Sequence, residues 1–129
     1  MSDIANYLQN KLVGHTFCKS TFTPVNTYYA ALATTITTLT DTVVEVPTGT
    51  AYARQVITFG AVGDGKCYNN NGVQFPAATT PWGTIGWVAI YDASTGGNLI
   101  LRKNVDSPAY VYTGVVFSLG YNQLSIQMI

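Results

Sequence analysis

The chain has 129 residues, which is the size of one domain, and a chain this long can bury a core without a metal ion or a disulfide. Only 9% of its residues are charged, against about 25% in an ordinary soluble domain, and six basic side chains balance six acidic ones. So few cations cannot neutralise a run of phosphates or a membrane surface, which excludes nucleic acid and membranes as partners. No apolar run approaches the roughly 18 residues that cross a bilayer, and residues 1–7 carry no secretory signal.

Uncharged polar residues replace charges on the predicted surface, and threonine alone supplies 18 positions. Net charge normally keeps monomers apart, so a neutral chain of this kind is poorly protected against association. We therefore expect a homo-oligomer, either a dimer or a trimer.

The first predicted element is a short α-helix within residues 1–14. Ser2 or Asp3 can cap its N-terminus, and Gly14 is predicted to end it. A helix of about three turns is marginally stable in isolation, so its apolar stripe must dock on the protein's own sheet or on a neighbouring subunit. The residues of this stripe recur every four positions: Ile4, Leu8 and Leu12.

From residue 17 onward, short stretches rich in β-branched and aromatic residues alternate with a period of two. Turn signals separate them, at Gly63–Gly65, at Asp92–Gly97 and at the Asn71-Gly72 pair. Strands spaced 8–12 residues apart are typical of an antiparallel β-sandwich. We expect an all-β fold, a jelly roll within that class, in one domain (1–129) whose sandwich spans 17–129. The predicted strands are Tyr28–Thr34, Thr42–Val46, Ala53–Val62, Tyr68–Phe75, a central and most apolar Ile85–Tyr91, Asn98–Arg102, Tyr110–Tyr112, Val115–Leu119 and Leu124–Met128.

Catalytic and metal-binding motifs are missing from the sequence. His15 is the one histidine, with no second ligand at zinc spacing and no nucleophile motif; at the helix end it can cap the C-terminus. Asp41 and Glu45 lie four apart, but a glycosidase pair needs a defined separation across a cleft. Gly63-Asp64-Gly65-Lys66 lacks the spacing of a phosphate loop. We expect no catalysis, no metal and no cofactor.

The two cysteines, Cys18 and Cys67, can pair, but nothing in the sequence near them favours a disulfide. Without an export signal, we expect two reduced, buried thiols.

A charge-poor, threonine-rich segment runs from Thr34 to Val43. Insertion hairpins of pore-forming toxins have such a composition, but the alternation here is imperfect. We favour a flexible or edge segment that makes contacts between subunits.

Tyrosine and tryptophan are the side chains that raise the question of ligand binding. They can stack on sugar rings, but they are also frequent in cores and subunit interfaces. Trp82 and Trp87 flank Gly83-Thr84 and are expected to pack, whereas Tyr110 and Tyr112 share one strand face and can form a platform.

Arg54 is one cation in the otherwise uncharged stretch Tyr52–Val56. We expect it to pair with a carboxylate such as Asp92 or to bind turn carbonyls. The alternative is an anchor at a partner surface, where arginine is favoured.

Four separated stretches carry a family resemblance when they are taken in order: Asn6–Phe17, Tyr28–Leu32, Tyr52–Val56 and Val73–Leu101, the last with Trp82-Gly83-Thr84 and Ile90-Tyr91-Asp92-Ala93. Together they resemble a family of small virion proteins of tailed bacteriophages, described as tail-fibre, head-fibre or decoration proteins. The resemblance implies a structural protein of the virion, made in the host cytoplasm, and offers no catalytic motif.

Within that family we expect a capsid decoration (cement) protein that binds the major capsid protein and bridges capsomers through many shallow contacts. The alternative is a tail- or head-fibre component that recognises host-surface glycans. The candidate partner contacts are Ile4, Leu8, Leu12, Arg54, Tyr110 and Tyr112.

Overall fold

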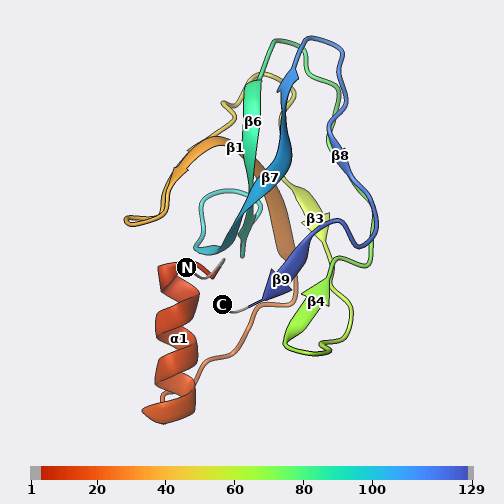
Figure 1. Ribbon diagram of the computed structural model, residues 1–129. Helices are drawn as coiled ribbons and strands as arrows, with labels where there is room; N and C mark the ends of the chain where they lie inside the picture. The colour runs from red at the N-terminus through yellow and green to blue at the C-terminus, as the bar shows by residue number, and fades with distance from the viewer. Residues whose placement is uncertain (1–3, 128–129) are drawn as a thin grey trace.

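Figure 1 shows the computed structural model of the protein, which describes residues 4–127. Its largest element is an antiparallel sheet with the strand order β2-β1-β6-β7. A fifth strand, β3, pairs with residues 28–30 of β1, whereas β2 pairs with residues 33–37. The predicted apolar strand lies inside this sheet as β6, between β1 and β7. The strands of the sheet are β1 (Tyr28–Thr37), β2 (Thr42–Glu45), β3 (Gln55–Ile57), β6 (Gly83–Tyr91) and β7 (Leu99–Val111).

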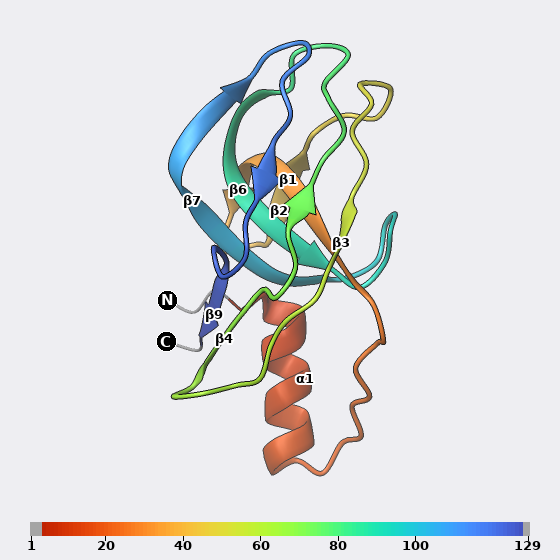
Figure 2. The same ribbon diagram turned by 90° about the vertical axis from the view of Figure 1, so that its right-hand side faces the viewer.

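A second layer covers one face of this sheet and consists of two short antiparallel ribbons (Figure 2). In one ribbon β4 (Lys66–Tyr68) pairs with β9 (Ser125–Gln127), and in the other β5 (Val73–Gln74) pairs with β8 (Ser118–Leu119). The prediction of an antiparallel all-β fold with one short N-terminal helix is therefore confirmed. The jelly-roll connectivity within that class stays a prediction.

The main core fills the space between the two layers. Alternate residues of β1 and β6, such as Leu32, Val88 and Ile90, point into it because successive side chains of a strand face opposite sides. Phe75 and Leu124 meet them from the second layer. The outer face of the sheet is lined by small residues, Ala31, Ala33 and Ala89, which Trp87 and Tyr91 partly cover.

The helix α1 (Asn6–Phe17) runs three residues past the predicted end at Gly14. A helix interior tolerates glycine at a cost of about 1 kcal/mol of stability relative to alanine, so a glycine does not by itself end a helix. Instead Lys19 adopts the left-handed conformation (φ 62°), and the N–H groups of Cys18 and Ser20 both bond to the Gly14 carbonyl. Ser2 and Asp3, the predicted caps, lie outside the described residues; Asn6 donates its N–H to Asp41 Oδ2 at 2.7 Å.

Two of the three residues of the predicted apolar stripe, Ile4 and Leu8, pack on the protein's own sheet. Ile4 lies just before the helix, is buried, and forms a β-bridge with Leu101 of β7. Leu8 is half-buried against the main core, and Leu12 is half-buried further along α1. Within residues 4–127, no helix is both long enough and apolar enough to span a membrane.

Several strand boundaries differ from the predicted ones. β1 extends to Thr37, so the threonine-rich segment is the β1–β2 hairpin at a sheet edge, which confirms the edge part of that prediction. Two predicted strands merge into the 13 residues of β7. Ala53–Val62 keeps only β3 and a single bridge at Phe59, and the last predicted strand reaches Met128, outside the described residues.

The turn at Asn71-Gly72 does not join a hairpin, because β4 and β5 on its two sides pair with β9 and β8. Tertiary pairing overrides this local signal. The turn at Gly63–Lys66 is a true hairpin turn: these two residues exchange both backbone hydrogen bonds, and Asp64 and Gly65 between them have φ values of 53° and 73°.

Ala51 lies in the turn before β3 with a φ of 65°, which costs a residue with a Cβ about 1–2 kcal/mol. We expect Ala51→Gly to raise the free energy of unfolding by about 0.5–1 kcal/mol, since part of the relieved strain is offset by the entropy of glycine. Ala53→Gly, at an exposed position with negative φ, is the matched control and should lower it. Urea denaturation measures the free energy of unfolding of both variants. A loss of stability in both would contradict backbone strain at Ala51.

Candidate functional site: a groove along strand β7

Strand β7 lies at an edge of the main sheet, where Ile4 and Ala5 pair with its start, and it carries a large β-bulge further along. Ile85 of β6 pairs with Ala109, but Trp87 pairs with Asn104, so the four residues 105–108 lie opposite Gly86 alone. A Cβ on Gly86 would lie 3.3 Å from the Thr34 carbonyl oxygen of β1, so a larger residue at this position would crowd the backbone of β1. Bulges at sheet edges bend a strand and redirect its side chains.

The bulge opens a groove of about 610 Å³ between β7 and the segment that contains β8 and leads into β9. This volume falls within the range of about 300–1,000 Å³ that is typical of small-molecule sites. Amide, hydroxyl and carboxylate side chains make up half of its lining, and most of the others are apolar. The lining residues are Val88 of β6, residues 103–107 of β7, Phe117, Ser118, Leu119, Gln123, Leu124 and Ser125.

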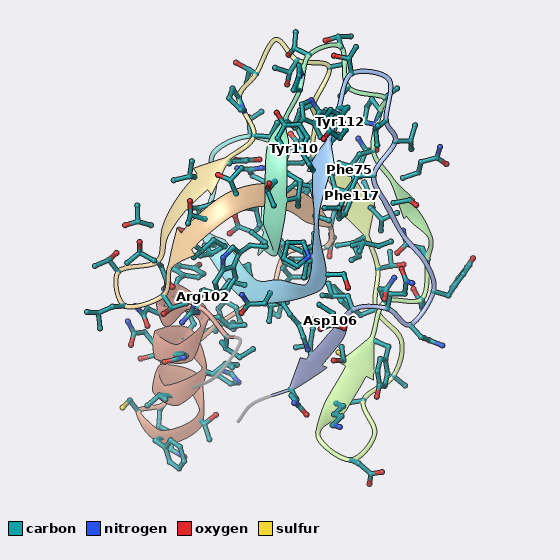
Figure 3. The ribbon with its side chains drawn as sticks, turned by 45° about the horizontal axis from the view of Figure 1, so that its top comes forward. Phe75, Arg102, Asp106, Tyr110, Tyr112 and Phe117 are labelled. Carbon is teal, nitrogen blue, oxygen red and sulfur yellow. The ribbon has the colours of Figure 1, made fainter. Side chains whose placement is uncertain are left out.

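Phe117 supplies the aromatic part of the groove. Its ring lies 6.1 Å from the ring of Phe75, at an angle of 71°, and Phe75 is fully buried in the core. Figure 3 shows the two rings next to each other. This edge-to-face contact with a buried ring connects the wall of the groove to the core.

The two charged residues of the groove differ in whether they form hydrogen bonds within the protein. Lys103 donates from Nζ to the carbonyl oxygen of Ser125 at 2.8 Å and to its Oγ at 2.7 Å, which connects β7 to β9. Asp106 on the bulge is exposed and forms no hydrogen bond or ion pair with any of residues 4–127. Its carboxylate is therefore available to a ligand.

Tyr110 and Tyr112 lie at the far end of β7 from the helix (Figure 3). Their ring centroids are 4.4 Å apart, and 46% and 63% of these residues are exposed. Tyr112 follows the last residue of β7, and the two rings lie next to each other, so they can form the platform considered above. Their contact with a partner stays a prediction.

Arg54, another candidate contact, is used inside the protein. Its side chain is 7% exposed, and it forms a bidentate pair with Glu45 (both 2.9 Å) rather than with Asp92. It also donates to the carbonyls of Ala93 and Gly96 at 2.8 Å and stacks on Tyr91. Four of its five N–H groups are thus engaged, as expected for an arginine that binds turn carbonyls.

Asp41 and Glu45 do not form a catalytic pair, because each belongs to a different arginine. Asp41 pairs with the buried Arg102 at 3.2 Å, while Glu45 accepts from Arg54 and from the Tyr52 hydroxyl. Neither carboxylate lines the groove.

The remaining candidate residues have structural surroundings. His15 donates from Nδ1 to the Ser20 carbonyl at 3.1 Å at the helix end. Trp82 is buried and donates to the Thr50 carbonyl, which confirms it as a packing residue. Both cysteines are free, but Cys18 is exposed, so the expectation of two buried thiols is wrong. Partial burial raises the pKa of the Cys67 thiol.

Among the described residues, no cluster of three or more His, Cys, Asp and Glu can hold a metal.

No sequence signal indicated the groove, because it depends on a bulge whose register is set by pairing between β6 and β7. Asp106 is one of the six acidic residues of the sequence, and no motif surrounds it.

The structure is that of a small all-β protein with a groove along one edge of its main sheet. Residues 3–127 match the family described as Podophage GP4 fiber I protein gp80. The chain belongs to this family, which confirms the predicted class of tailed-phage virion structural protein. No curated protein matches the chain.

Proposed function

We propose that this chain is a non-enzymatic subunit of a podophage fibre that binds saccharides of the host surface. The observation that carries the proposal is the groove along β7, where amide, hydroxyl and carboxylate groups lie together with apolar side chains and the phenyl ring of Phe117. Such a mixture suits a sugar, which presents hydroxyl groups at its rim and C–H groups on its faces.

The family description supports the fibre component, the alternative of the sequence analysis, more than the capsid decoration protein that we expected first. A cement protein needs broad shallow contacts and no concave site. The groove gives this chain a feature that the fibre role uses and the cement role does not.

A single open groove binds a saccharide weakly, and a fibre overcomes this by presenting several copies at once. The neutral, charge-poor surface favours the association that supplies them, so we include a homo-oligomer, a dimer or a trimer, in the proposal.

Binding of the purified protein to the bacterium that the phage infects tests the proposal. We expect saturable binding to intact cells, measured with a fluorescent label, and competition by polysaccharide extracted from the same cells. Cryo-electron microscopy of the virion should place the chain in a fibre. Density that coats the shell, together with no binding to cells, would restore the capsid decoration protein.

A further inference from the structure

We infer that the groove along β7 selects saccharides that carry two neighbouring hydroxyl groups and holds these hydroxyls on the carboxylate of Asp106. The inference rests on the proposed function and names the ligand class of the same site.

The acceptor and donor groups of the groove suit hydroxyl-rich ligands. An ionised carboxylate only accepts hydrogen bonds, and its two oxygens can take one bond from each of two adjacent hydroxyls. Asp106 is the lining carboxylate and has no hydrogen-bond or ion-pair partner within residues 4–127. Asn104 and Ser107 on either side of it add groups that both donate and accept.

Lys103 and Asp106 are the two charged side chains of the groove, and their charges are opposite. The ammonium of Lys103 is bound to two neutral oxygens of Ser125, which connects it to β9. The charges of the groove therefore do not select between neutral and acidic sugars. The two acceptor oxygens of Asp106 select for neighbouring hydroxyl groups.

The backbone of the bulge opposes the other occupant that a sheet edge attracts, an added peptide strand. Residues 105–108 have left the regular ladder with β6, and Pro108 among them has no N–H to donate. Bulges and prolines are the features by which natural edge strands prevent pairing with another chain. Recognition in this groove therefore depends on side chains.

The test compares Asp106→Asn with Asp64→Asn, which removes the same charge from the exposed hairpin turn outside the groove. The probe is polysaccharide extracted from host cells, and binding is measured by calorimetry. We expect Asp106→Asn to weaken binding about tenfold or more, because one of the two charge-assisted acceptors is lost, and Asp64→Asn to leave it within about twofold. Asn104→Ala, also on the exposed surface, should weaken binding to a smaller extent.

Periodate, which cleaves the C–C bond between carbons that carry neighbouring hydroxyls, tests the diol directly. We expect the wild-type protein to lose binding to periodate-oxidised, borohydride-reduced polysaccharide. Equal binding by both aspartate variants, while the wild type binds host cells, would overturn the groove as the site and leave the proposed function standing. No wild-type binding to native cells or polysaccharide would overturn the proposed function itself. A change of oligomeric state in Asp106→Asn, seen by light scattering, would make the groove an interface between copies and also overturn the inference.

Discussion

Replacing Arg102 with methionine should lower the free energy of unfolding by about 3–5 kcal/mol, the cost of breaking a buried ion pair from one side. Arg102 is 4% exposed and its partner Asp41 is 13% exposed. The guanidinium also donates to the Ile4 carbonyl at 2.9 Å, and Asp41 accepts the first helical N–H at Asn6. The loss of Arg102 leaves the charge of the Asp41 carboxylate uncompensated and removes one of the donors to the Ile4 carbonyl, at the joint between α1, the β1–β2 turn and β7.

Thermal denaturation should show this loss as a fall of roughly 10–20 °C in Tm for a domain of this size. Arg102→Met combined with Asp41→Asn should be more stable than Arg102→Met alone, because the buried charge is then gone; asparagine also tolerates the φ of 54° at this position. Lys66→Met, at an exposed position, is the control and should change Tm little. A loss no greater than that of Lys66→Met would show that the joint is not held by this pair.

The group of Glu45, Arg54 and Tyr52 should make stability depend on pH in acid. Burial acts to raise the pKa of the Glu45 carboxyl, but hydrogen bonds from Arg54 and Tyr52 and the charge of Arg54 outweigh it, so the pKa lies below its ordinary 4.5. The stabilisation is therefore fully present above about pH 4.5, and it is lost as the pH falls through the lower pKa of the folded protein.

We expect Glu45→Gln to lower the free energy of unfolding by about 2–3 kcal/mol at pH 7, because Arg54 loses both of its charged acceptors. The difference between wild type and variant should shrink as the pH falls below 4.5. Urea titrations at several pH values measure it, with Asp64→Asn as a control that should keep the wild-type slope. A difference that stays constant down to pH 2 would contradict the depressed pKa.

Arg54→Ala should likewise lower Tm in the isolated protein, since four hydrogen bonds and the stacking on Tyr91 disappear together. This outcome separates a residue that holds β2 to the β6–β7 turn from an anchor on a partner surface. An anchor would leave Tm unchanged.

Local chemistry was enough to predict the features that depend on neighbours in the chain. The nearly continuous apolar run Ile85–Tyr91 predicted a central strand, and β6 lies inside the sheet. Asp64 and Gly65 can both adopt positive φ, so the hairpin turn followed from the sequence. The family was also recognisable, because its motifs lie in short continuous stretches.

Only the tertiary structure decided the features that depend on pairing between distant segments. The helix does not end at Gly14 but continues to Phe17, and Lys19 after it adopts the left-handed conformation. Asp41 accepts the N–H of Asn6 at the start of the helix, although the two residues are 35 positions apart in the sequence. Arg54 takes Glu45 rather than Asp92, since β1–β2 pairing brings Glu45 beside it. The groove and Asp106 arise from a register shift between β6 and β7, which no residue in the bulge signals by its own propensity. Composition and periodicity set which face of a segment is apolar, whereas strand register is a sum over contacts between segments and is settled when the chain folds.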